Sequence, residues 1–238
     1  MNLTPAILKE LRFDDFVVLD LETTGLDPTT DRIIEIGAIR FQNGRETEVF
    51  TSLINPGVSI PDFITKLTGI SDSDVQTAPD IQDKLTPLLD FIGDSVLIGH
   101  QINFDSAFIE YLLRRQHNDF HLWEVETQRF KYFNNSRLDT LFLARIFLPF
   151  LPRFTLSMVE AYFKIALEKA HRAIEDARAS GHIFLQLIDR TIACNIQTLR
   201  QIIRLLYPNS GRVKHFFQPV LEYKLKNNID TTAAGITE

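Results

Sequence analysis

The most constraining feature of the sequence is an apolar run that leads directly into two acids. Residues 16–19 are apolar with two β-branched side chains, which predicts a buried strand. Asp20 and Glu22 follow, and because side chains alternate faces along a strand, both carboxylates leave the same face. Two like charges in such a position are unfavourable unless a cation lies between them. The pattern therefore favours a hard divalent cation such as Mg²⁺.

An Asp-x-Glu pair on its own is equally compatible with two solvated or salt-bridged residues at the end of a strand. Here a Thr23-Thr24-Gly25 turn follows at once, which places the acids at the carboxyl end of a core strand. Open sheets usually bind their ligands at that end. We therefore favour metal binding over a purely structural role.

The order of the other elements predicts an α/β fold. Residues 32–41 and 49–54 predict two more strands, joined through a tight turn at Asn43-Gly44, and residues 95–98 predict a fourth. An antiparallel meander followed by alternating strands and helices gives a mixed sheet flanked by helices. The expected helices lie at 6–11, 61–67, 81–92, from 104 onward, 138–148 with a strand-like start, 155–163, 173–191 and 196–206. Residues 117–137 are expected to form a long loop or an extra hairpin.

Two further stretches contain candidate site residues. Asp105 lies in the first turn of the helix after residues 95–98, where an anion complements the helix dipole. His171 and Asp176 are five residues apart, so on one continuous helix they would point in different directions. A shared site requires His171 in the loop before the helix and Asp176 in its first turns. Taken singly, each stretch is also explained by helix capping or by solvated surface residues.

Taken together, these stretches resemble the DEDDh exonucleases, the family of the proofreading epsilon subunit of bacterial DNA polymerase III. The resemblance rests on DLETTGLD at 20–27, GHxxxFD at 99–105 and HRAIEDA at 171–177. Shorter matches support it, among them DRIIEIGAI at 31–39 and LDTL at 138–141. The resemblance covers about residues 14–192. It implies a ribonuclease-H-like fold with a mixed five-stranded sheet, and 3′→5′ exonuclease activity by a two-metal mechanism.

The resemblance also implies a role for individual residues. Two divalent cations, Mg²⁺ or Mn²⁺, would be held by four carboxylates: Asp20, Glu22, Asp105 and Asp176. His171 would be the general base. The residues implied to contact the terminal nucleotide are Thr23, Thr24, Leu26 and Phe104. For Leu26 and Phe104, packing in the core is an equally good explanation. Many relatives carry asparagine at the position of Gln101, a departure that leaves the catalytic set intact.

The implied substrate is the 3′ end of DNA, with single strands preferred. A Thr-Thr-Gly turn after the Asp-x-Glu pair, rather than the Met-Thr-Gly of many oligoribonucleases, favours DNA over RNA. An exoribonuclease remains the alternative, as does a proofreading subunit whose main role is to bind a polymerase. The net charge of −6 argues against a protein that wraps duplex DNA.

The rest of the composition concerns location and domain organisation. A single cysteine, Cys194, suits a reducing cytosol, and the absence of a signal peptide or long apolar run predicts a cytoplasmic protein without a membrane span. We expect an exonuclease domain at residues 1–194. Residues 195–238 would form a helical appendage with a disordered tail, dispensable for chemistry and used for docking a polymerase or for self-association.

Overall fold

The structure, a computed structural model, describes residues 3–119, 133–165, 171–206 and 211–229. Its centre is a five-stranded sheet in the order β3-β2-β1-β4-β5. The strands pair antiparallel from β3 to β1 and parallel from β1 to β5, which confirms the predicted mixed sheet. The strands are β1 Asp15–Thr23, β2 Ile33–Gln42, β3 Arg45–Leu53, β4 Val96–Gly99 and β5 Arg137–Asp139.

The predicted meander is present, with one strand starting earlier than expected. Asn43 and Gly44 both have positive φ, 53° and 77°, as a two-residue type I′ hairpin requires. This turn joins β2 directly to β3, so β3 begins at Arg45 and not at residue 49. The first part of β3 is polar and largely exposed because β3 is an edge strand, and it therefore lacks the apolar pattern that marks the other strands.

Helices cover both faces of the sheet. They are α1 Pro5–Leu11, α2 Asp62–Thr68, α3 Asp72–Val75, α4 Ile81–Ile92, α5 Ile102–Asp119, α6 Thr140–Phe147, α7 Leu156–Phe163, α8 Ala173–Ala193, α9 Ile196–Leu206 and α10 Gly211–Lys226. The helix α5 extends into the stretch predicted as a loop or hairpin, of which residues 120–132 lie outside the described residues. A search of the described helices finds none with the length and apolar character needed to cross a membrane.

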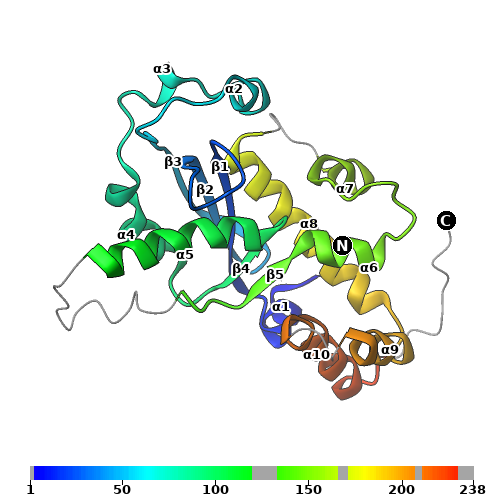
Figure 1. The fold of residues 1–238 in the computed structure, drawn as a ribbon. Coiled ribbons are helices and arrows are strands. Elements are labelled where there is room, and N and C mark those ends of the chain that lie inside the picture. Colours follow the sequence, from blue (N-terminus) through cyan, green and yellow to red (C-terminus); the bar gives the residue numbers. More distant parts are fainter. Residues whose placement is uncertain (1–2, 120–132, 166–170, 207–210, 230–238) are drawn as a thin grey trace.

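Alternate side chains of β1 enter two separate cores. Phe16 and Val18 belong to a cluster with residues of α8, whereas Val17 and Leu19 pack with residues of α4 and α5. Figure 1 shows α8 on one face of the sheet and α4 and α5 on the other. Because the alternation continues, Asp20 and Glu22 follow Phe16 and Val18 onto the face that α8 covers.

The start of α8 lies unusually close to the sheet. A Cβ atom placed on Gly37 of β2 would lie 2.2 Å from the carbonyl carbon of Ala173, the first residue of α8. Gly37 is also the cross-strand partner of Asp20. The absence of a side chain at Gly37 therefore lets the first turn of α8 come down beside the acids of β1.

The C-terminal helices pack against the rest of the fold. Figure 1 shows α9 and α10 beside α1, at the end of the molecule away from α2 and α3. Phe216 and Phe217 of α10 are buried, and the Phe216 ring lies 5.8 Å from the rings of both Phe13 and Phe184. Residues of α10 thus share the hydrophobic core on the α8 face of the sheet. The predicted domain boundary after Cys194 stays a prediction, and the predicted disordered tail falls largely on residues 230–238, outside the described residues.

This packing leads to the first testable prediction. Truncation after Cys194 removes Phe216 and Phe217 from the core, and each fully buried phenylalanine contributes about 1.5–3 kcal/mol. We expect the free energy of unfolding, measured by urea denaturation, to fall by at least about 3 kcal/mol. Truncation after Ile229 keeps α10 and is the control. Equal stability of the two truncated chains would show that 195–229 is an independent appendage.

Candidate active site

Three carboxylates meet at the carboxyl end of β1. Asp20 and Glu22 come from β1, and Asp176 comes from the first turn of α8. One carboxylate oxygen of each residue lies within 4.8 Å of the corresponding oxygens of the other two. All three side chains are half-buried, so the cluster is sheltered by the fold and still accessible from solvent.

A fourth carboxylate, Asp105, adjoins this cluster from α5. It is only 3% exposed, and its Oδ1 accepts a hydrogen bond of 2.9 Å from the backbone N–H of Leu21. The pairing of β1 with β4 ends at Val18, so Asp105 occupies the β1 edge beyond that point. Its charge raises the pKa of Asp20, which shows that the two groups interact. The structure therefore brings together all four predicted acids.

The acids of the site hold their protons more tightly than ordinary carboxyl groups. Burial, and then the charges of Asp105, Asp176 and other acids, raise the pKa of Asp20 well above its usual value. For the same two reasons, burial first, the pKa of Glu22 is raised to about 7. Burial is also the main reason that the pKa of Asp105 is raised to about 8 and that of Asp176 to about 6.

These shifts arise because the carboxyl groups are buried and because the charges of Arg172 and His171 offset only part of the repulsion among the acids. A divalent cation would supply further positive charge, and hard cations prefer carboxylate oxygens as ligands. The donor set therefore fits a divalent cation, held by Asp20, Glu22 and Asp176 with Asp105 adjoining.

His171 lies off the helix, as the spacing required. It precedes α8 by two residues, and its side chain is exposed. Its backbone adopts a φ of 61°, a left-handed conformation that is uncommon for residues other than glycine. Both its charge and its backbone N–H act on Asp176 and lower the pKa of that carboxyl, opposing the effect of burial. His171 is therefore adjacent to the acidic cluster.

The two threonines at the end of β1, Thr23 and Thr24, are held by hydrogen bonds. The Thr23 hydroxyl donates to the carbonyl of Gly25 at 2.6 Å, and the Thr24 hydroxyl accepts from the backbone N–H of Arg32 at 2.9 Å. Both side chains are buried. Leu26, by contrast, is 84% exposed, which excludes core packing as the explanation for this residue.

Phe104 differs from Leu26. Its ring is half-buried and packs 5.2 Å from the ring of Phe108, which belongs to the core between the sheet and α4 and α5. Part of its surface is thus committed to the fold, and part remains accessible beside Asp105.

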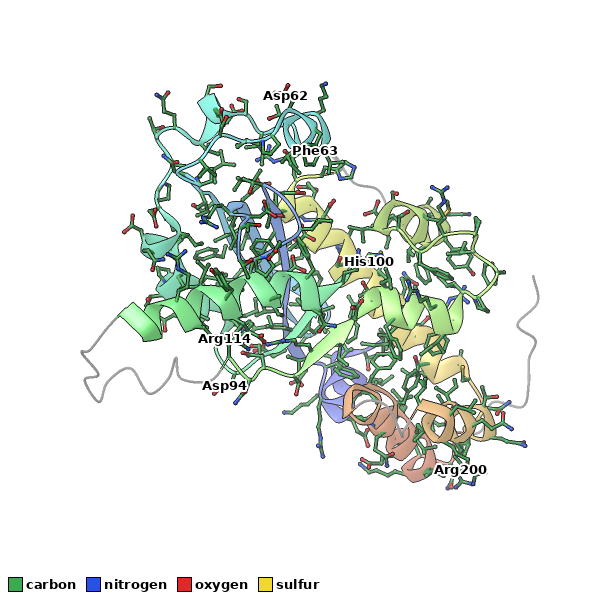
Figure 2. The ribbon with its side chains drawn as sticks, in the orientation of Figure 1. Asp62, Phe63, Asp94, His100, Arg114 and Arg200 are labelled. Carbon is green, nitrogen blue, oxygen red and sulfur yellow. The ribbon has the colours of Figure 1, made fainter. Side chains whose placement is uncertain are left out.

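The stretch that presents Asp105 is fixed by polar contacts. Figure 2 shows His100 where the start of α5 meets α6. Its ring nitrogens contact the Thr140 hydroxyl at 3.0 Å and the carbonyl of Phe154 at 2.7 Å. Gln101 has a φ of 75°, and its backbone N–H donates to Asp139. Asparagine adopts this conformation more readily than glutamine, which explains why the motif can carry asparagine at this position.

Sequence reasoning missed two acids near the site. Glu35 of β2 is 1% exposed and pairs with Arg172, and it pairs across the strands with Glu22. Glu35 is a lone acid in an otherwise apolar strand, and this pattern indicates a buried charge that needs a partner. Glu160 of α7 is buried, and burial together with the charge of Asp176 raises its pKa to about 7. Glu160 stands in an ordinary helical pattern, which does not distinguish it from a solvated surface residue.

Comparison with known proteins agrees with this site. The model of the exonuclease family RNase_T matches residues 17–184. The chain is 36% identical over 200 residues to a PolC-type DNA polymerase III of Caldanaerobacter subterraneus subsp. tengcongensis, covering 84% of this chain and 13% of the polymerase. It is 34% identical over 174 residues to the DNA polymerase III subunit epsilon of Aquifex aeolicus, covering 73% of this chain and 80% of that subunit.

The chain belongs to the exonuclease family, and the predicted resemblance to DEDDh exonucleases is confirmed. The nuclease domain of 3′hExo, described as a DEDDh family member bound to rAMP, has the same fold, with a TM-score of 0.59 at 16% identity. That match covers 74% of this chain and 92% of the nuclease domain. The ribonuclease-H-like fold is therefore confirmed as well. The chain spans only about an eighth of the PolC-type polymerase.

The raised pKa values predict how metal binding depends on pH. Without a cation, the folded chain keeps protons on Glu22, Asp105 and Asp176 that the unfolded chain releases near pH 4, so stability falls as pH rises from about 4 to about 8. A cation replaces these protons. The stabilisation by Mn²⁺, which is about 2.7 kcal/mol at 100 times the dissociation constant, should therefore be larger near pH 8 than near pH 5.5 at a fixed Mn²⁺ concentration.

Thermal unfolding with and without Mn²⁺ at the two pH values measures this difference. Asp176→Asn is the comparison variant, because it removes one ligand and one proton-binding group while nearly preserving the shape of the side chain. Its melting temperature should respond less to Mn²⁺ at both pH values. An equal response in the variant and the wild-type protein would place the bound ions elsewhere.

Proposed function

We propose that this protein is a metal-dependent 3′→5′ exonuclease that releases nucleoside 5′-monophosphates from DNA. The observation that carries the proposal is the meeting of Asp20, Glu22 and Asp176, within 4.8 Å of one another, beside Asp105 and His171. Bringing four acids together is unfavourable for folding, and it is explained by chemistry that requires divalent cations.

The four carboxylates and His171 would have separate roles in the reaction. Asp20, Glu22, Asp105 and Asp176 would hold two cations, Mg²⁺ or Mn²⁺, which stabilise the negative charge that develops on the scissile phosphate. His171 takes the proton of the attacking water. The new bond joins this water oxygen to phosphorus, and the broken bond is the one from phosphorus to the 3′ oxygen of the shortened strand. The exposed position of the His171 side chain supports this role, because a base must exchange its proton with solvent.

The choice of DNA as substrate is supported by the relatives. Both are named as DNA polymerase III components, although the nuclease domain of 3′hExo is described with a ribonucleotide, which keeps RNA as the alternative. The exposed Leu26 and the accessible part of Phe104 would contact the terminal nucleotide. Such apolar contacts tolerate any base, so we propose that single strands are preferred without sequence specificity.

A partner is proposed on the same basis. The Aquifex relative is named as a polymerase subunit, which supports docking of this chain to a polymerase or to a second copy through residues 195–238. Leu205 of α9 is 76% exposed and is available for such a contact. The polymerase names and the single cysteine, Cys194, are consistent with action in the cytoplasm.

The central test is hydrolysis of a labelled oligonucleotide. Asp20→Asn should lower the rate by at least about 10³-fold, because bound metal supplies several kcal/mol of transition-state stabilisation. Asp15→Asn alters the opposite end of the same strand, where Asp15 pairs with Arg40, and should leave the rate unchanged. Single-stranded DNA should be degraded faster than duplex DNA or RNA. Undiminished hydrolysis in EDTA would contradict the proposal, and faster degradation of RNA would favour the exoribonuclease.

His171 generates a separate prediction. General-base catalysis contributes about 10²–10⁴-fold to the rate, so His171→Ala should lose activity within that range. Mg²⁺ and Mn²⁺ favour oxygen ligands, and the imidazole is therefore expected outside the first coordination sphere. Calorimetric titration with Mn²⁺ should give nearly the wild-type affinity. A loss of metal affinity as large as the loss of rate would make His171 a ligand.

A further inference from the structure

The most unusual charged group outside the site is Glu35, near the start of β2. It is 1% exposed and is the cross-strand partner of Glu22, so the two side chains share one face of the sheet. A buried carboxylate whose charge acts on three other acids, Asp20, Glu22 and Asp176, is unfavourable unless that charge is compensated by close partners. The compensating partners of Glu35 come from the two residues that separate His171 from the body of α8.

Glu35 receives donors from both residues. Its Oε1 accepts from Arg172 Nη2 at 2.6 Å and from Nε at 3.0 Å, and its Oε2 accepts from Nε at 3.2 Å. The same Oε2 accepts from the backbone N–H of Ala173 at 2.9 Å. Both oxygens are thus directed at the loop and the helix start, which argues against Glu35 as a metal ligand.

The bond to Ala173 resolves a problem at the start of α8. The first N–H groups of a helix have no partner within the helix and are usually capped by the residue before it. Here that residue is Arg172, and an arginine side chain has no acceptor. The Glu35 carboxylate supplies the acceptor from the neighbouring strand. Arg172, Ala173 and the sheet are therefore fastened together at one point.

These hydrogen bonds act directly on the position of His171. His171 is the next residue, held at a φ of 61° that non-glycine residues adopt at an energetic cost. We propose that Glu35 is a positioning residue: through Arg172 and the Ala173 amide it fixes the backbone that presents His171 to the attacking water. The inference rests on the proposed function and concerns the orientation of the base, not the binding of metal or substrate.

The chain offers a matched control. Glu46 of β3 also pairs with an arginine of α8, Arg178, at 3.1 Å. That pair joins the same sheet to the same helix, but Arg178 lies further along α8, away from His171. Glu46→Gln therefore reports the effect of weakening a contact between the sheet and α8 without disturbing the loop that carries the base.

A double-mutant cycle with His171→Ala tests the proposal. Glu35→Gln should lower kcat by about 10–100-fold with little change in KM, because a misplaced base affects the chemical step more than substrate binding. In the His171→Ala background the same substitution should change kcat by less than about 2-fold, since no base remains to be misplaced. Glu46→Gln should leave kcat near the wild-type value in both backgrounds.

Arg172→Lys provides a second variant in case Glu35→Gln does not fold. Lysine keeps the positive charge but cannot donate to the Glu35 carboxylate from two nitrogens, as Nε and Nη2 of Arg172 do. The loss of kcat in this variant should likewise disappear in the His171→Ala background. An equal loss in both backgrounds would overturn the positioning role and leave Glu35 a purely structural residue. A collapse of Mn²⁺ affinity in Glu35→Gln would also overturn it, by making Glu35 a ligand.

These outcomes separate the inference from the proposed function. Full activity of His171→Ala would remove His171 as the base, and an inactive wild-type protein would overturn the exonuclease proposal itself. Amide hydrogen exchange does not depend on activity. Glu35→Gln should speed exchange at Ala173 and at the amides that follow it, and unchanged exchange there would show that Glu35 does not hold the start of α8.

Discussion

Mutual repulsion among carboxylates is the constraint on which the rest of the structure depends. Five acids share the carboxyl end of β1: Asp20, Glu22, Glu35, Asp105 and Asp176. Three of them have a compensating partner. Asp105 accepts a hydrogen bond from the Leu21 amide, Glu35 pairs with the Arg172 guanidinium, and Asp176 interacts with the charge and the backbone amide of His171. Asp20 differs, because every described group that shifts its pKa raises it. The fold thus compensates the outer acids and leaves the central charge to be balanced by a cation.

The same constraint explains a glycine in the sheet. Asp176 can reach Asp20 and Glu22 only if α8 begins almost in contact with β2, and a Cβ on Gly37 would collide with the backbone of Ala173. Glu35 lies two residues before Gly37 in β2, and its carboxylate accepts a hydrogen bond from the backbone N–H of Ala173. One short segment of β2 therefore sets both the distance and the orientation of the helix that completes the site.

Local patterns were sufficient to predict the elements that carry the catalytic motifs. The apolar run before Asp20, the hairpin turn at Asn43-Gly44 and the position of His171 before a helix all depend on neighbouring residues, and all appear in the structure. Contacts between distant segments could not be predicted in this way. The pairing of Glu35 with Arg172 and the burial of Phe216 against Phe13 depend on tertiary packing, which leaves no periodic pattern in a single sequence.

The helix α8 also links the site to the C-terminal helices. At its start, the carboxylates of Glu35 and Asp176 lie where the helix dipole favours negative charge. At its other end, the buried Lys224 of α10 donates to the carbonyl of Ile192 at 2.6 Å, where the dipole favours positive charge. Both ends are held by buried charges from other elements. A change in α10 that moved Lys224 would therefore act on the helix whose first turn presents Asp176.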